Sequence, residues 1–278
     1  MLIFVRFIET YMNNDMVLSS STPSRAFLYG DAVSVSFFIR NSKLVFAEES
    51  YFFLMASMRK MRMSIPLSYT LEFFQELFQK EILQKEWKEG IIHFMVYRES
   101  TEGPLEKASV QFWYGFAPLT HLIALQSPLK MDLIKEINVN TNLLSNIRVH
   151  CSENIYGQIY ALENDLDDVI LLNPNKRIAR TTLGNLLLLN GDVIRVPKQS
   201  EGAYISPLME AFVTFVHKNN LAQIEQAELV AFESQKAEEI LLISEERGLF
   251  SVGKIRNKEF SNLRFTEWVD KWKNSMLD

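Results

Sequence analysis

Cysteine is nearly absent from this sequence, and patterns that mark several common binding sites are missing too. Cys151 is the only cysteine among 278 residues, which excludes an intrachain disulfide and a cysteine metal cluster. This usage suits a reducing cytosol, so we expect a cytoplasmic protein. The histidines lack the spacing of metal ligands, so no metal site is predicted. They are His93, His121, His150 and His217.

Long apolar runs and basic stretches are also missing. No run approaches the ~18 apolar residues that a membrane-spanning helix requires. The apolar start at residues 1–8 is too short and wrongly flanked for a signal peptide. The formal net charge is -5, and the short basic cluster at residues 59–62 is typical of the solvated end of a helix. We therefore expect neither a membrane nor a nucleic acid as partner.

The composition is that of a folded protein with more than one core. Apolar residues make up 47% and charged residues 23% of the chain, which is close to ordinary globular values. A chain of this length is long enough to form two domains. We predict an N-terminal α/β domain at 1–120, a linker at 121–130 and a C-terminal α/β domain at 131–278. Ser127-Pro128-Leu129-Lys130 is the best linker candidate.

Hydrophobic patterning in the first half predicts strands around a helical block. Residues 32–40 and 44–46, joined by a short polar turn, predict a β-hairpin. Apolar residues recur at three- and four-residue spacing over 48–61 and predict a helix. The other predicted elements of this half are an amphipathic helix over 71–82, capped by Ser68 or Thr70, and strands at 91–97 and 110–116.

The second half alternates between strand and helix patterns. Asn190-Gly191-Asp192 between two apolar runs is a strong hairpin signal. Ser206-Pro207 opens a helix, with serine as N-cap and proline at the first position. The remaining predictions are a helix with Ile155, Ile159, Leu162 and Leu166 on one face, strands at 169–172 and 240–244, and a helix over 265–276. The fold class is mixed α and β.

Several segments, in order, resemble those of one family. Ser24-Arg25-Ala26-Phe27-Leu28-Tyr29-Gly30-Asp31 resembles the Arg-Gly-Phe-x-Tyr-Gly-Asp stretch of the class IV aminotransferases. The predicted helix from Glu48 to Pro66 is similar to the next helix of that family. Three later segments match in order and spacing: 180–186 (Glu-x-Thr-x-Ser-Asn-Ile/Val in the family), 204–206 (Gly-Ile-Thr) and 237–242 (Ala-Asp-Glu-Val-Phe-Leu).

The resemblance covers nearly the whole chain and carries several implications. The family includes branched-chain aminotransferases, D-amino-acid aminotransferases and aminodeoxychorismate lyases, and the lyases are the most similar in length. It implies the D-amino-acid aminotransferase-like fold (fold type IV), an α+β or α/β arrangement of two domains with the pocket between them. It also implies pyridoxal phosphate in that pocket and a homodimer.

Pyridoxal-phosphate chemistry needs a lysine amine that forms a Schiff base. Counting back from the strand at 169–172, the resemblance puts the family lysine at or next to Arg148. Arginine cannot replace it, because the guanidinium stays protonated and has no free amine lone pair. No lysine lies between Lys135 and Lys176, so a small alignment shift does not restore the amine.

The other cofactor contacts depart from the family as well. The acid that keeps the pyridine nitrogen protonated corresponds to Arg180, a cation. Two like charges ~4 Å apart repel by about 4 kcal/mol at an effective dielectric constant near 20. By the resemblance, Phe53 occupies the position where the family has a phosphate-binding arginine. Ser244, Glu245 and Glu246 occupy the position of the family's phosphate-binding turn. Only Ile205 and Ser206, at a helix N-terminus, keep anion-binding character.

We therefore expect a class IV aminotransferase-like protein that has lost pyridoxal-phosphate catalysis, and no cofactor is predicted. It would be a non-catalytic or small-anion-binding homologue, with Arg148, Arg180, Tyr29 and Thr182 around the ligand pocket. One hypothesis is that Arg148 and Arg180 pair with Glu245 and Glu246 and fill the vacated pocket, because buried charges need partners. The alternative is that these four are surface or cleft charges of a diverged fold.

A competing hypothesis keeps the protein as an enzyme. It would be an active pyridoxal-phosphate aminotransferase or aminodeoxychorismate lyase with a displaced lysine, or a different catalyst in the same cleft. Lys176 and Lys198 are the lysines near the matched segments of the second domain. Both fall on predicted turns or strand ends, outside the position where the family needs its amine.

Overall fold

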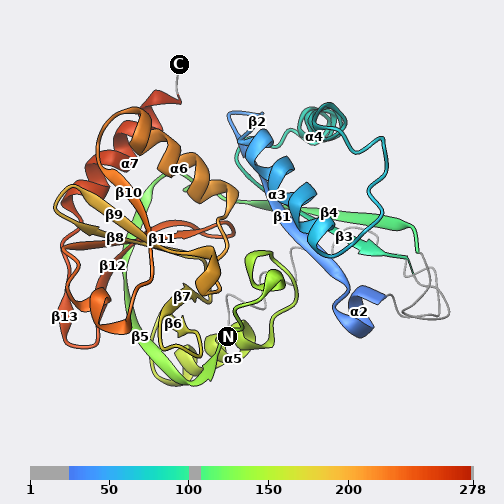
Figure 1. Cartoon of the computed structure of the whole chain (residues 1–278). Helices are drawn as coiled ribbons and strands as arrows, with labels where there is room; N and C mark the ends of the chain where they lie inside the picture. The colour runs from blue at the N-terminus through green and yellow to red at the C-terminus, as the bar shows by residue number, and fades with distance from the viewer. Residues whose placement is uncertain (1–24, 100–107, 277–278) are drawn as a thin grey trace.

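The computed structural model describes residues 25–99 and 108–276. Ser24 and the apolar start at residues 1–8 lie outside this range. The described chain forms two bodies that lie side by side, one around each of two β-sheets (Figure 1). None of the described helices is long and apolar enough to cross a membrane.

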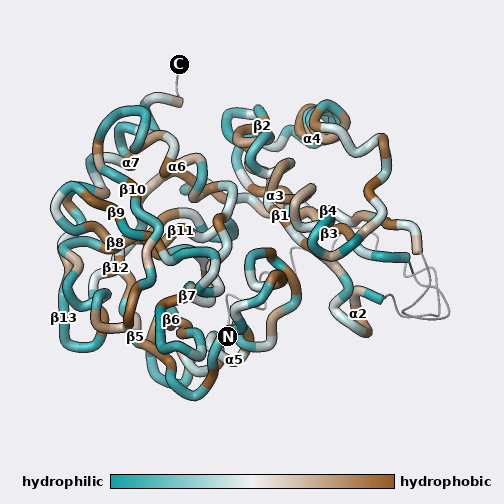
Figure 2. Tube along the Cα trace, viewed as in Figure 1, coloured by the Kyte–Doolittle hydropathy of each residue, from teal (hydrophilic) through white to brown (hydrophobic). Residues whose placement is uncertain are grey.

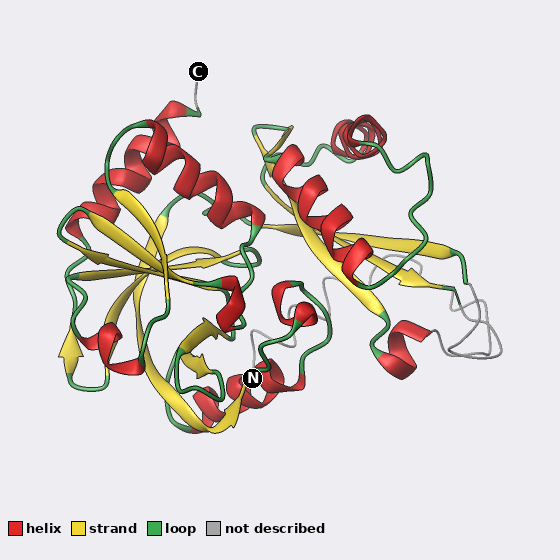
Figure 3. Cartoon of the chain, viewed as in Figure 1, coloured by secondary structure: helices red, strands yellow, loops and turns green. Residues whose placement is uncertain are grey.

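The smaller body is an antiparallel four-stranded sheet with helices over one face (Figure 3). Its core is aromatic: the Phe37 ring lies 4.7 Å from Phe78 and 5.9 Å from Phe94, and all three are fully buried. The predicted hairpin, helices and strands of this half are confirmed, and Thr70 is the N-cap of the second long helix. The elements are α2 (Arg25–Tyr29), β1 (Ala32–Arg40), β2 (Lys43–Val45), α3 (Ala47–Lys60), α4 (Leu71–Gln84), β3 (Gly90–Arg98) and β4 (Val110–Pro118), with sheet order β2-β1-β3-β4.

The larger body is built on a mixed nine-stranded sheet. Its order is β10-β9-β8-β11-β12-β5-β6-β7, and β13 pairs with β12. The strands are β5 (Leu125–Asn138), β6 (Asp168–Leu172), β7 (Ile178–Thr181), β8 (Asn185–Asn190), β9 (Val193–Pro197), β10 (Gln223–Ala227), β11 (Glu239–Ser244), β12 (Gly248–Ile255) and β13 (Lys258–Glu259). The hairpin around Gly191 and the strands at β6 and β11 are confirmed.

The central strands are buried on both faces. Every residue of β11 and all but the last of β8 are buried, and their sequences are nearly continuous apolar runs. Figure 2 shows this hydrophobic character in the middle of the larger body, around β8 and β11. Continuous rather than alternating apolar residues are expected for strands covered on both sides. Here α6 (Pro207–Lys218) and α7 (Leu263–Ser275) lie together above the sheet (Figure 1).

Residues 125–130 of the expected linker form the beginning of β5, which pairs in parallel with β12. Pro128 lacks a backbone N–H, yet the pairing continues because its register shifts on either side of Val252, opposite Leu129. Proline is tolerated in a sheet at such irregularities. The polar, proline-containing sequence was typical of a linker, but in the fold it is a strand.

The helix predicted beyond residue 150 is α5 (Ser152–Glu163), but its apolar face does not pack on the sheet. Ile155, Ile159 and Leu162 are 49%, 52% and 73% exposed. The helix instead turns Gly157 and Ala161 inward. A Cβ on Gly157 would lie 2.6 Å from Cγ2 of Thr182, so α5 approaches the sheet more closely than a larger residue would allow.

The two bodies share one apolar cluster. Phe38 and Ile91 of the small sheet pack with residues of α6 and α7, and the Phe46 ring stacks on Trp272 at 5.5 Å. Arg40 also donates a hydrogen bond to the backbone oxygen of Lys273 at 3.2 Å. These contacts hold the bodies together at one end of their interface.

We predict that Ser206→Ala destabilises the larger body. The Ser206 hydroxyl is buried and accepts a hydrogen bond from the Met209 N–H at 3.2 Å, which caps α6. Loss of such a cap costs about 1 kcal/mol in the free energy of unfolding, which urea denaturation would measure. Ser152→Ala, at the exposed start of α5, is the control and should change it by less than about 0.5 kcal/mol. Equal losses in both variants would contradict the capping role.

Candidate functional site

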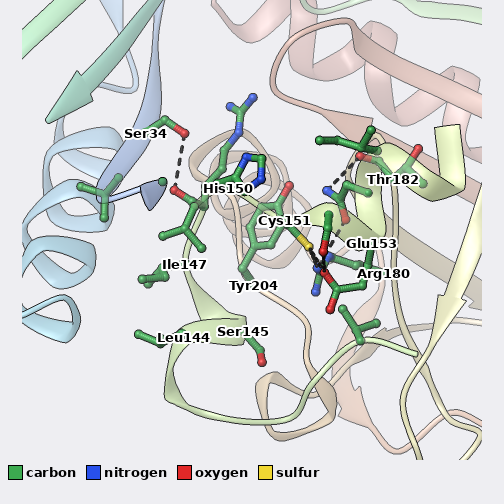
Figure 4. A pocket seen from close by; sticks show the side chains of 18 of the residues that line it. Ser34, Leu144, Ser145, Ile147, His150, Cys151, Glu153, Arg180, Thr182 and Tyr204 are labelled. Carbon is green, nitrogen blue, oxygen red and sulfur yellow. Dashed lines mark hydrogen bonds between the residues drawn. The ribbon is translucent and has the colours of Figure 1, made fainter. Parts of the chain in front are cut away.

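A cavity of about 610 Å³ lies where the two bodies face each other (Figure 4). Its walls come from the start of β1, the segment between β5 and α5, the beginning of α5, the end of β7 and the turn between β11 and β12. The lining residues that the chemistry depends on are Ser34, Arg148, His150, Cys151, Asn154, Arg180, Thr182, Tyr204, Glu245 and Glu246.

Arg148 links the two bodies across this cavity. It lies in an extended segment, and its backbone oxygen accepts a hydrogen bond from the Ser34 N–H of β1 at 3.0 Å. Its guanidinium donates to the Ser36 hydroxyl at 3.3 Å. It also forms ion pairs with Glu245, at 3.2 Å, and with Glu246. The cation therefore contacts two acidic side chains.

Glu245 is a carboxyl group held in an apolar setting. It is 3% exposed, and burial raises its pKa to about 7 even though Arg148 acts in the opposite direction. Its Oε1 has no hydrogen-bond partner in the described part of the chain. His93 is also affected: burial, and then the charge of Arg148, lower its pKa to about 4. This histidine is neutral near pH 7.

Arg180 is buried and forms no ion pair among the described residues, although its charge, after hydrogen bonds to the Glu153 N–H, Cys151 and Ser152, is among the causes that lower the pKa of Glu153. It lies on β7 and is 6% exposed. Its guanidinium donates to the Gly202 backbone oxygen at 2.8 Å, to Cys151 Sγ at 3.2 Å and to Asn154 Oδ1 at 3.4 Å. None of the 13 ion pairs found among described residues includes it. Figure 4 shows it pointing toward Cys151 at the start of α5.

The expected network of two arginines and two glutamates is thus only half formed. Arg148 forms ion pairs with both glutamates, whereas Arg180 donates hydrogen bonds to neutral groups. The reason is position: Glu245 and Glu246 stand at the end of β11, on the Arg148 side of the cavity. Arg180 instead projects from β7 toward the N-terminus of α5. For Arg180, the pairing hypothesis is wrong.

The N-terminus of α5 opens onto the cavity beside Arg180. Cys151 is its N-cap residue. The Asn154 N–H donates a hydrogen bond to the Cys151 backbone oxygen at 3.2 Å, and the Glu153 N–H donates to the Glu153 carboxylate. Cys151, Glu153 and Asn154 line the cavity. Burial raises the pKa of the Cys151 thiol, although the charge of Arg180 opposes this. The positive end of a helix and a buried guanidinium therefore face the same space.

Asp168, which sequence reasoning missed, fixes the turn between β7 and β8. It is fully buried and accepts hydrogen bonds from the Thr182 hydroxyl at 2.5 Å and from the N–H groups of Thr182 and Leu183, both at 3.2 Å. Burial raises the pKa of Asp168, and these donors oppose the shift. The sequence does contain a signal for Asp168. It is an acid directly before the apolar run 169–172, and an acid at the start of a buried strand needs hydrogen-bond partners.

Tyr204 is a second missed cavity residue, and several predicted site residues lie elsewhere. Tyr29 is 66% exposed and is not among the lining residues. The Phe53 ring lies 6.2 Å from that of Tyr204. Ser206 uses its hydroxyl to cap α6. Ile205, Ser206, Ser244 and Phe53 do not line the cavity, whereas Arg148, Arg180, Thr182, Glu245 and Glu246 do.

No lysine is among the described residues that line this cavity. Lys176 is exposed on the turn before β7, and Lys198 pairs with Glu228 at 3.5 Å on the surface. Outside the described ranges the sequence contains one lysine, Lys107. Within the described ranges, no group of three or more histidine, cysteine, aspartate or glutamate side chains could hold a metal ion.

The comparisons with known proteins agree on the family. The profile of the family described as amino-transferase class IV matches residues 36–255, which is most of the chain. The protein therefore belongs to the class IV aminotransferases, and the resemblance of its sequence segments to that family is confirmed. No curated protein gives a significant match.

Solved structures show the same fold at low identity. A Legionella pneumophila protein provisionally named a 4-amino-4-deoxychorismate lyase is 18% identical, with a TM-score of 0.81 over 93% of this chain and 97% of that one. The Escherichia coli branched-chain aminotransferase is 14% identical, with a TM-score of 0.81 over 95% and 92%. A Pseudomonas aeruginosa 4-amino-4-deoxychorismate lyase is 13% identical, with a TM-score of 0.77 over 92% and 94%. The predicted fold type IV architecture is confirmed.

We predict a pH dependence of stability that Glu245→Gln removes. The pKa of Glu245 is raised from 4.5 to about 7 in the fold. Its contribution to stability is therefore complete below pH 4.5 and is lost as the pH rises through about 7. Relative to Glu245→Gln, the wild type should lose up to about 3 kcal/mol of unfolding free energy over this range.

Urea denaturation at several pH values measures this difference. Glu246→Gln makes the same chemical change on the more exposed partner of Arg148, and it controls for the loss of one ion pair. A difference between the wild type and Glu245→Gln that stays constant from pH 4.5 to 8 would contradict the burial argument.

Proposed function

We propose that this protein has lost pyridoxal-phosphate catalysis and binds a small anion at Arg180. The observation that carries the proposal is a buried guanidinium that forms no ion pair among the described residues and faces a large cavity at the N-terminus of a helix. The Glu153 carboxylate acts on it only through longer-range electrostatics. A buried charge without a counter-charge is costly. An anionic ligand would supply the direct ion pair that Arg180 does not form with a described residue.

The donors at this place suit an oxyanion. A guanidinium has five N–H donors, and the three neutral acceptors around Arg180 do not compensate its charge. The beginning of α5 adds backbone N–H groups and a partial positive charge of about 0.5. Arg148 is less suited to bind the anion, because it already pairs with Glu245 and Glu246.

The cavity does not fit pyridoxal phosphate. The described lining residues offer no amine for a Schiff base. Arg180 and Arg148 are cations, and neither can supply the carboxylate that would keep a pyridine nitrogen protonated. Phe53 packs near Tyr204 rather than offering a phosphate-binding cation. These residues support the loss of the cofactor and give no basis for a catalytic step through it.

The alternative is an active aminotransferase or aminodeoxychorismate lyase, the activities named for the similar structures, with a displaced lysine. It would need Lys176 or Lys198 to reach the cavity, although neither lines it. A homodimer and a cytoplasmic location remain expectations alongside both readings.

We predict that Arg180→Gln weakens anion binding. Isothermal titration with sulfate, phosphate and acetate should show one site per chain for at least one of them. Charge-assisted hydrogen bonds contribute about 1.5–3 kcal/mol, so affinity should fall roughly 10- to 100-fold in the variant. Arg195→Gln removes a surface arginine that pairs with Glu225 and Glu233, and it should bind as the wild type does. Unchanged binding in Arg180→Gln would contradict the proposal.

We also predict that pyridoxal phosphate forms no covalent adduct. After incubation with excess cofactor, the absorbance spectrum should lack a Schiff-base band. Borohydride reduction followed by peptide mass analysis should find no stoichiometrically modified lysine. A single modified lysine at full occupancy would identify the displaced amine and favour the enzymatic alternative.

A further inference from the structure

Tyr204 lies at the position where, by the resemblance, the family has the glycine of its Gly-Ile-Thr segment. Glycine has no side chain, whereas tyrosine brings a phenol ring to the same point of the backbone. Tyr204 belongs to the short segment before α6. Its backbone oxygen accepts a hydrogen bond from the side chain of Asn185, in β8, at 2.5 Å. The backbone that carries the ring is therefore fixed to the large sheet.

The segments that the resemblance assigns to phosphate binding surround this ring. The Phe53 ring of α3 lies 6.2 Å from the ring of Tyr204, measured between the centroids. Residues 205–206 follow Tyr204 directly in the chain. Burial raises the pKa of the Tyr204 hydroxyl, the charge of Arg148 opposes this shift, and the Glu245 carboxylate adds to it. The turn after β11 is therefore near the ring as well.

Tyr204 separates these segments from the open cavity. It is one of the residues that line the cavity (Figure 4), whereas Phe53, Ile205, Ser206 and Ser244 do not line it. A ligand that enters the cavity meets the phenol ring before it can reach any of these four residues. The place that the resemblance assigns to a phosphate group is thus covered by a side chain of the protein itself.

The beginning of α6, next to this ring, also has fewer donors than most helix N-termini. Pro207 is the first helical residue and has no backbone N–H. The Met209 N–H already donates to the Ser206 hydroxyl at 3.2 Å. Anions bind at helix N-termini through free backbone N–H groups. Two of the groups that a phosphate could use are therefore missing or occupied.

We propose that Tyr204 is a specificity-determining residue that closes the phosphate-binding place of this fold. Its ring, packed against Phe53, occupies the space through which a phosphate group would reach residues 205–206 and the turn after β11. Phosphate esters are thus excluded by volume, in addition to the loss of cationic contacts. This inference rests on the proposed loss of pyridoxal-phosphate catalysis, and it names the residue that enforces the loss. It does not depend on the identity of the anion that binds at Arg180.

Titration calorimetry with inorganic phosphate tests the inference. All proteins carry Arg180→Gln, so that the proposed anion site does not contribute. Adding Tyr204→Gly should raise the affinity for phosphate ~10-fold or more, because backbone N–H groups behind the ring become accessible. Tyr204→Phe is the matched control: it removes the hydroxyl but keeps the ring, and it should give no gain. In the wild-type background, Tyr204→Gly should add one phosphate site per chain.

Phe53→Arg shows whether the opened place is the one that we propose. Together with Tyr204→Gly, the new guanidinium should strengthen phosphate binding by a further factor of roughly 10 to 100, as a charge-assisted hydrogen bond does. With Tyr204 in place, Phe53→Arg should add nothing, because the ring still covers the site. Equal gains from Phe53→Arg with and without the ring would overturn the closing role of Tyr204, and this arm needs no loss of the ring to be informative.

Thermal melts show which variants fold. Tyr204→Ala is the second variant with a small side chain, and phosphate should raise the melting temperature of each folded variant that binds it. If folded Tyr204→Gly or Tyr204→Ala binds phosphate no better than Tyr204→Phe, this inference is wrong, and the proposed site at Arg180 is unaffected. A covalent pyridoxal-phosphate adduct on the wild type would overturn both proposals, because the cofactor would then bind with Tyr204 in place.

Discussion

The interactions of Arg148 shape the region between the two bodies. Its backbone extends the hydrogen bonding of β1, and its side chain reaches Glu245 and Glu246 on the opposite body. Arg148 and the segment around it, between β5 and α5, form a large part of the cavity wall. Arg148 pairs with both glutamates, whereas Arg180, the cation to which we propose that an anion binds, forms no ion pair among the described residues.

In the function that we propose, the fold is kept and the cofactor chemistry is lost. No lysine lines the cavity within the described residues, and its two arginines are Arg148, which pairs with Glu245 and Glu246, and Arg180. The fold remains that of the class IV aminotransferases because their similarity is carried by buried strands and helix caps. Those features do not depend on the residues that line the cavity, so the fold can persist while the chemistry changes.

Sequence patterns predicted the elements that local chemistry determines. Ser206-Pro207 and the Asn-Gly-Asp turn at 190–192 mark their helix and hairpin directly. β5 was missed because its pairing with β12 is decided by distant residues, and β7 because Arg180 interrupts its apolar pattern. The face of α5 was misjudged because Gly157 gives no hydrophobic signal, although it sets the closest contact.

The site was predictable only where spacing along the chain was enough. The family resemblance assigned Arg148, Arg180 and Thr182 to one pocket, and in the structure all three line one cavity. Their partners could not be assigned, because which glutamate reaches which arginine depends on side-chain direction. Tyr204 and Asp168 contribute through burial, which a single sequence shows poorly.

The placement of Cys151 has a practical consequence. It is the only thiol in the chain, and it lies at the cavity wall within 3.2 Å of the Arg180 guanidinium. A thiol-directed dye or spin label would therefore attach at one place only, next to the charge that we assign to the ligand. A ligand bound in the cavity should therefore slow the labelling of this thiol, so the rate of modification reports occupancy without introducing or removing any cysteine.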